Sequence, residues 1–104
     1  MSFEADSVIP NSHPSLEGHF PGNPIVPGVV VLDEVINAAL AWKPEAQVGG
    51  FAAVKFLTPL LPDEPFSIQF TEMGSRRAKF NCYKKSNSES AFATGQLKLD
   101  HPEV

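Results

Sequence analysis

The chain has 104 residues, a length that suits one domain, residues 1–104, with a modest hydrophobic core. Hydrophobic residues make up 42% of it and charged residues 19%, as in soluble globular domains. The formal net charge of −4 argues against binding to nucleic acid or membrane surfaces through overall charge. The sequence shows no signal peptide and no apolar run of membrane-spanning length, and its single Cys82 cannot form an internal disulfide. We therefore expect a cytosolic protein without membrane insertion, whose larger ligand sites borrow walls from a second subunit.

A short strand is predicted over residues 2–9, followed by a long loop over residues 10–27. The loop holds five of the ten prolines of the chain, and each proline fixes its own φ and restricts the residue before it. So long a loop is uncommon in a compact domain unless it has a function. Its stiffness suits the positioning of one side chain, and His19 is the candidate.

A helix is predicted from Gly28 to Trp42, about 22 Å long, ended by a lysine-proline pair. It is apolar nearly all round, which predicts burial, yet it carries Asp33, Glu34 and Asn37. A buried carboxylate is costly unless it is paired or used in chemistry, and desolvation would favour its protonated form. A histidine held near Asp33 would form an acid/base pair.

The rest of the chain alternates between apolar and polar residues, which predicts four strands joined by short turns at residues 61–65, 73–75 and 86–89. The predicted core-facing sets are Val48, Gly50, Ala52, Val54 and Phe56; Phe66, Ile68 and Phe70; Ala78, Phe80 and Cys82; and Ala93, Gly95, Leu97 and Leu99. The Gly49–Gly50 pair indicates a β-bulge. The order of elements predicts an α+β domain, an antiparallel sheet with the helix on one face.

Residues 18–29, GHFPGNPIVPGV, with Asp33 fourteen residues after His19, closely resemble the signature of the 3-hydroxyacyl-[acyl-carrier-protein] dehydratases. The resemblance continues through residues 54–63, VKFLTPLLPD. It implies the hotdog fold, in which an antiparallel sheet wraps around one central helix. Short relatives occur beside specialised pathways such as aryl-polyene synthesis, so the resemblance allows a role in fatty-acid or polyene-type biosynthesis.

The resemblance also implies roles for individual residues. His19 and Asp33 match the catalytic histidine and carboxylate, which in the family come from different subunits of a homodimer. Gly28 matches the glycine whose N–H faces the thioester carbonyl, and we expect Val29, Pro27 and Phe20 to line the substrate beside it. The implied substrate is a thioester of acyl carrier protein or coenzyme A. We expect no cofactor, and no spacing of His, Cys and carboxylate residues suggests a metal site.

Dehydration of a 3-hydroxyacyl thioester needs a base at C2, a proton donor at C3 and stabilisation of charge on the carbonyl oxygen. Histidine suits the first task near neutral pH. Asp33 could supply the second, and the unpaired N–H groups at the start of the helix the third. Glu34, His13 and His101 are better explained as structural or idle residues.

Other functions stay open at this point. A hotdog thioesterase would activate water with a carboxylate and would not need the His19 loop. A non-catalytic acyl-binding or scaffold subunit could complete a heterodimeric site. One basic cluster, Arg76, Arg77, Lys79, Lys84 and Lys85, is either a solvated strand face or a docking patch for an acidic carrier, with Arg76, Arg77 and Lys79 as its best candidates.

Overall fold

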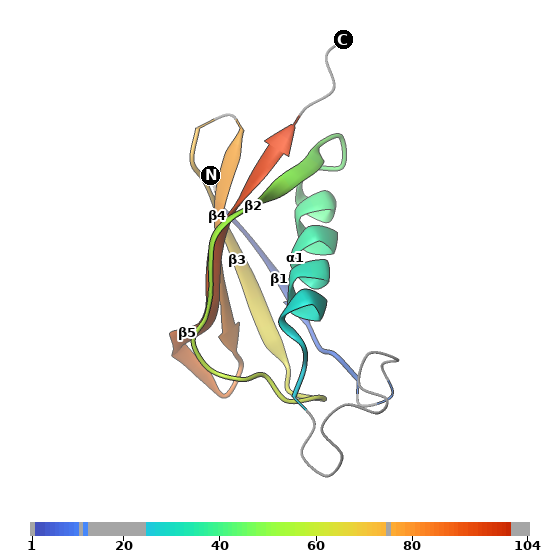
Figure 1. The fold of residues 1–104 in the computed structure, drawn as a ribbon, viewed down its shortest axis with the longest axis vertical. Coiled ribbons are helices and arrows are strands. Elements are labelled where there is room, and N and C mark those ends of the chain that lie inside the picture. Colours follow the sequence, from blue (N-terminus) through green and yellow to red (C-terminus); the bar gives the residue numbers. More distant parts are fainter. Residues whose placement is uncertain (1, 11, 13–24, 75, 101–104) are drawn as a thin grey trace.

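A single antiparallel sheet of five strands packs one face against one helix (Figure 1). The structure is a computed structural model in which residues 2–10, 12, 25–74 and 76–100 are described. In chain order the elements are β1 (Ser2–Ser7), α1 (Gly28–Trp42), β2 (Gln47–Phe56), β3 (Phe66–Glu72), β4 (Arg77–Lys84) and β5 (Asn87–Asp100). The strand order is β1-β3-β4-β5-β2, and every neighbouring pair is antiparallel. The predicted α+β architecture is confirmed, and no helix among the described residues is long and apolar enough to cross a membrane.

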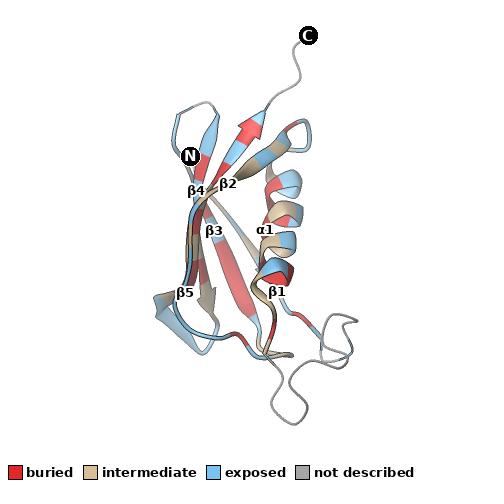
Figure 2. Ribbon diagram, in the orientation of Figure 1, coloured by how far each residue is buried: buried red, intermediate tan, exposed pale blue. Residues whose placement is uncertain are grey.

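The hydrophobic core lies between α1 and the sheet face that it covers (Figure 2). The helix contributes Val30, Val31, Val35, Ala38 and Ala39. The sheet contributes Phe66, Ile68, Phe70, Ala78, Phe80, Cys82, Ala93, Leu97 and Leu99. The core-facing sets predicted for the last three strands are therefore confirmed, because those strands keep the two-residue alternation of a pleated sheet through these positions. The last strand begins at Asn87, inside the turn predicted at residues 86–89, because Lys85 and Ser86 alone make the turn.

Strand β2 departs from the prediction. Its pairing with β5 slips between Val48 and Gly50 and again between Ala52 and Lys55, so each slip adds one unpaired residue to β2. The first slip confirms the predicted glycine bulge. Val48 and Val54 of the predicted set pack on the core, but Phe51 packs there in place of the predicted Gly50 and Ala52. The reason is that each bulge reverses the face on which the following residues lie.

The C-terminal end of α1 is fixed to strands β1 and β3. The Trp42 ring stacks on Phe3 and Phe70, with centroid separations of 6.0 Å and 5.3 Å. Lys43 lies over the Trp42 ring and pairs with Glu72, Nζ to Oε1 2.5 Å. These contacts hold one end of the helix firmly, so the Gly28 end comes to the opposite end of the sheet.

Gly95 leaves the room that the Phe80 ring needs. A Cβ atom on Gly95 would lie 2.7 Å from two atoms of that ring and 3.1 Å from Val54 Cγ2, and Phe80 is fully buried. We therefore expect Gly95→Ala to lower the free energy of unfolding by about 1–3 kcal/mol through overpacking. Urea unfolding measures this change. The control Thr71→Ala, on the exposed side of β3, should stay within about 0.5 kcal/mol of wild type. Equal stability of Gly95→Ala and wild type would contradict the packing described.

Candidate functional site

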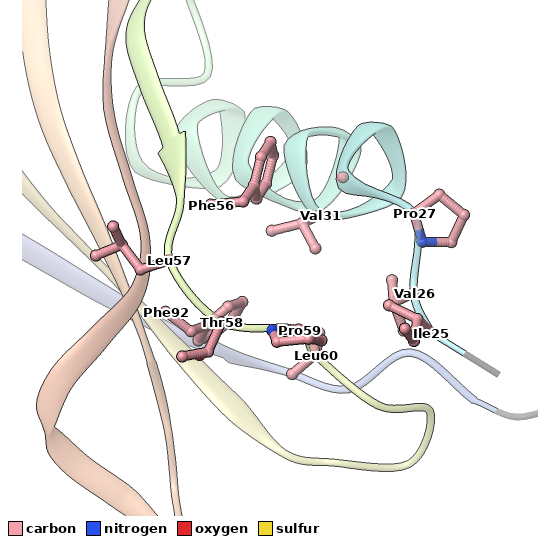
Figure 3. Close-up of a pocket in the computed structure, with 11 residues that line it drawn as sticks. Ile25, Val26, Pro27, Val31, Phe56, Leu57, Thr58, Pro59, Leu60 and Phe92 are labelled. Carbon is pink, nitrogen blue, oxygen red and sulfur yellow. The ribbon is translucent and has the colours of Figure 1, made fainter. Parts of the chain in front are cut away.

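A cavity of about 590 Å³ opens beside the start of α1 (Figure 3). Its walls come from the helix start, from the segment that joins β2 to β3, and from β5. The described residues that line it are Ile25, Val26, Pro27, Gly28, Val31, Phe56, Leu57, Thr58, Pro59, Leu60 and Phe92. Thr58 is the one described lining residue with a polar side chain. The size and the apolar walls are typical of a site for a small hydrophobic group.

The start of α1 brings the first N–H groups of the helix to the edge of this cavity. Pro27 is the N-cap residue and makes no side-chain cap, and its carbonyl accepts from the N–H groups of Val30 and Val31 at 3.0 and 3.4 Å. No described residue accepts a hydrogen bond from the N–H of Gly28 or Val29. These donors lie at the positive end of the helix dipole, where they would stabilise negative charge on a ligand oxygen.

The ring of Phe56 rests on Gly28. A Cβ atom on Gly28 would lie 2.8 Å from ring atoms Cε2 and Cζ of Phe56, so only glycine fits beneath the ring in this position. Phe56 is the last residue of β2 and is half exposed, while the next residue is held by its N–H donating to the carbonyl of Phe92 at 2.8 Å. The backbone is thus fixed, while about half of the Phe56 surface is open to solvent. A ligand that reaches the Gly28 N–H would have to share this space with the ring.

Asp33 lies on the side of α1 that faces away from the sheet. It is exposed, as are Val29 four residues before it and Asn37 four residues after it. The expectation that the helix is buried all round is wrong for the single chain: Val29 is 65% exposed and Leu40 37%. The reason is that one sheet covers only one side of a helix. Glu34 is half-buried at the boundary between the two sides.

Some predicted residues lie outside the described part of the structure. These are His19 and Phe20 of the predicted site, and also His13 and His101. The described structure therefore brings together Pro27, Gly28 and Val29 at the helix start and places Asp33 on the same helix, while the distance from His19 to Asp33 stays a prediction.

The five basic residues of the predicted cluster separate in space. Three of them are exposed at the end of the sheet where α1 ends, away from the cavity: Arg76, Arg77 and Lys79 (Figure 1). In the strand register Arg77 lies opposite the like-charged Lys98. The other two form ion pairs near the cavity end of the sheet: Lys84 Nζ lies 3.4 Å from Glu64 Oε1, and Lys85 Nζ 2.8 Å from Asp6 Oδ1.

Two further features concern reactive groups. Burial raises the pKa of the Cys82 thiol to about 12, so it stays protonated at neutral pH and is no nucleophile, as its predicted place in the core indicated. In the described part of the chain, no three His, Cys, Asp or Glu side chains are arranged to hold a metal ion.

The sequence analysis missed most of the cavity wall. It placed Phe92 on the outer face of β5, but Phe92 is buried and lines the cavity. The pairing of β4 with β5 explains this: Cys82 pairs with Ala93 and Tyr83 with Ala91, so Phe92 is the extra residue of a bulge. The one available signal was the adjacent pair of Phe92 and Ala93, two apolar residues where strict alternation allows one.

One helix packed on an antiparallel five-stranded sheet is the arrangement of the hotdog fold, and comparison with known proteins agrees with it. "The Dehydratase Heterocomplex ApeI:P from Xenorhabdus doucetiae" is a solved structure with a TM-score of 0.79 and 22% identity, and the match covers 96% of this chain and 88% of that one. The family model of the ApeI-like proteins, ApeI dehydratase, matches residues 1–96, so the chain belongs to the ApeI-like dehydratase family.

Curated relatives lie in the same group of enzymes. The 3-hydroxyacyl-[acyl-carrier-protein] dehydratase FabZ of Enterococcus faecalis is 32% identical over 95 residues, 76% of this chain and 67% of the relative. FabZ of Geotalea uraniireducens is 31% identical over 103 residues, 88% of this chain and 71% of the relative. The predicted resemblance to the dehydratases is therefore confirmed.

The contact between Phe56 and Gly28 predicts the effect of a single methyl group. We expect Gly28→Ala to fold and to lower kcat/KM for a thioester substrate by about tenfold to a hundredfold, because the carbonyl can no longer approach the helix start closely. Steady-state kinetics measure the loss. In the double variant Gly28→Ala/Phe56→Leu, the smaller side chain makes room and part of the activity should return. Full activity of Gly28→Ala alone would rule out this close approach.

Proposed function

We propose that this chain converts 3-hydroxyacyl thioesters to trans-2-enoyl thioesters, with the acyl group carried on an acyl carrier protein, in fatty-acid or polyene-type biosynthesis. The observation that carries the proposal is the helix start itself: Gly28, whose N–H donates to no described residue, lines an apolar cavity, in a chain of a dehydratase family. An acyl thioester has one polar carbonyl next to an apolar chain, which is the shape of ligand that such a site would hold.

The reaction divides among three residues. The thioester carbonyl accepts a hydrogen bond from the Gly28 N–H, which stabilises the charge that grows on its oxygen. His19 removes the proton from C2, and the C–H electron pair forms the C2–C3 double bond. The C3–O bond breaks as Asp33 donates its proton, so that the hydroxyl leaves as water. The proton on His19 then returns to Asp33 through solvent, and the enzyme is ready for another substrate.

A second subunit is needed to complete this site. Asp33 is exposed, as is Val29 one helical turn before it, and Phe56 and Leu57 are large exposed apolar side chains at the end of β2. Strand β2 is an edge of the sheet, with backbone groups available for another strand. We propose that two copies cover these surfaces in a homodimer, so that His19 of one copy meets Asp33 of the other; larger assemblies of such dimers are compatible with this.

Mixing two inactive variants tests the shared site. We expect His19→Ala and Asp33→Asn each to lower kcat by about a hundredfold or more, because each removes a proton-transfer group. When the two are co-expressed, half of the dimers contain both chains and one of their two sites is intact, so activity should return to about a quarter of the wild-type value. The assay follows enoyl thioester formation.

A mixture that stays inactive would contradict a site shared between copies. Its control is the co-expression of the two variants with different affinity tags, because recovery of both tags in one purified dimer shows that the chains mix. Should the purified chain form no dimer with itself, a heterodimer becomes the better interpretation, since the similar Xenorhabdus doucetiae dehydratase is a heterocomplex.

Arg76, Arg77 and Lys79 are proposed to dock the acidic carrier, although they lie far from the cavity of their own chain. A two-fold axis that pairs two β2 edges makes them antiparallel, and this brings the basic end of one sheet beside the cavity end of the other. The carrier would then bind one subunit and deliver its acyl group to the site of the partner. The like-charged pair of Arg77 and Lys98 is unfavourable for the sheet alone, which supports a binding role.

Charge reversal tests this docking patch. We expect Arg77→Glu/Lys79→Glu to raise KM for a carrier-linked substrate by roughly threefold or more and to reduce its dependence on salt, because the attraction to an acidic partner is lost. KM for the same acyl group on a short pantetheine mimic should stay unchanged and serves as the control. Equal effects on both substrates would contradict carrier docking.

A thioesterase is the alternative enzyme, since it would use the same fold and an apolar pocket. The two reactions differ in product: the dehydratase forms an enoyl thioester and the thioesterase a free thiol. The expected cytosolic location stays a prediction.

A further inference from the structure

Phe92 stands at the far side of the cavity from the helix start. Figure 3 shows Phe92 and Leu57 on one side, and Ile25, Val26 and Pro27, the residues that lead into the helix, on the other. An acyl chain whose carbonyl sits at Gly28 therefore extends toward Phe92. The bulge in β5 is what turns this ring inward, since regular pairing would put it on the outer face.

The position of Phe92 is fixed by contacts of both its ring and its backbone. Its ring is 2% exposed and meets the fully buried Phe66 edge-to-face, with centroids 5.5 Å apart and planes at 89°. Its carbonyl accepts from the N–H groups of Leu57 and Thr58 at 2.8 and 3.4 Å. The neighbouring wall residues Val31 and Leu60 are equally buried in the core. This side of the cavity is thus rigid, in contrast to the half-exposed Phe56.

We infer that Phe92 is the wall that limits the length of the acyl group this chain accepts. The inference rests on the proposed function and adds to it a chain-length limit set by one aromatic residue. A chain that is too long would have to displace a ring packed into the core, whereas a shorter chain fits beside it. Each methylene group that is accepted or rejected in an apolar pocket changes kcat/KM by about 10- to 200-fold, so the limit should be sharp.

The test is Phe92→Leu, assayed on 3-hydroxyacyl thioesters whose acyl chains increase by two carbons. Leucine keeps the site apolar and leaves room where the ring was, so the longest accepted chain should lengthen by two or more carbons, with a gain of about tenfold for that substrate relative to the shorter ones. Phe80→Leu is the matched control. Phe80 is as buried as Phe92 and meets Phe51 edge-to-face at 5.9 Å, but it does not line the cavity.

The expected result is a changed chain-length profile in Phe92→Leu and an unchanged profile in Phe80→Leu. An unchanged profile in both, or the same change in both, would overturn the inference, while dehydration by the wild type would leave the proposed function intact. Absence of enoyl product from every substrate with the wild type would instead refute the proposed function.

A second variant covers the case in which Phe92→Leu fails to fold. Val31→Leu adds one methylene group to the opposite wall of the same cavity, and it should shift the preference toward shorter chains by a similar factor. No shift toward shorter chains in a folded Val31→Leu protein, shown by thermal unfolding, would likewise overturn the inference.

Discussion

The packing of one helix against one sheet is the constraint on which the rest of this molecule depends. A sheet five strands wide can cover only one side of α1, and the core confirms this: Val31 and Val35 are buried, while Val29 and Asp33 are exposed. A longer chain could cover the other side with further elements of its own. Here the exposed side combines apolar residues with a carboxylate, which suits a surface that another subunit covers. The proposed shared site would use this exposed side of α1.

The two ends of α1 have different tasks. At its C-terminal end, Trp42 stacks on two aromatic rings and Lys43 makes an ion pair, so that end is tightly held. At its N-terminal end, Pro27 supplies no side-chain cap, and the N–H groups of Gly28 and Val29 donate to no described residue. A side-chain cap there would add about 1 kcal/mol of stability, but it would occupy the donors that a thioester carbonyl needs. Stabilising contacts are thus concentrated at one end of the helix, and the proposed ligand binding lies at the other.

The sequence predicted those parts of the fold that follow a regular period. The helix from Gly28 to Trp42 and the buried faces of β3 and β4 agree with the structure, because apolar spacing and turn residues determine them directly. The prediction failed where the register between two strands shifts, because the core-facing residues of β2 and the position of Phe92 depend on bulges. Only the bulge at Gly49–Gly50 had a signal in the local sequence. The exposure of Asp33 could not be predicted from the helix alone, since it depends on how much of the helix the sheet covers. The motif around Gly28 led to the proposed functional residues, whereas the cavity wall, which carries no motif, was mostly missed.

The shifts in strand register that were not predicted from the sequence also form the cavity. After the bulge between Ala52 and Lys55, Phe56 pairs with the buried Ala93 and so faces the helix, where its ring meets Gly28. In the neighbouring strand, the bulge at Phe92 turns a second ring inward a few residues away in the sheet. Ala53 adopts φ 53°, which costs about 1–2 kcal/mol for a residue other than glycine. With regular pairing, Phe92 would face solvent and the sheet would lie flush against the helix start. The bulges interrupt the ladder hydrogen bonds and so cost some stability. They also leave an apolar cavity, lined by the rings of Phe56 and Phe92, next to the start of α1.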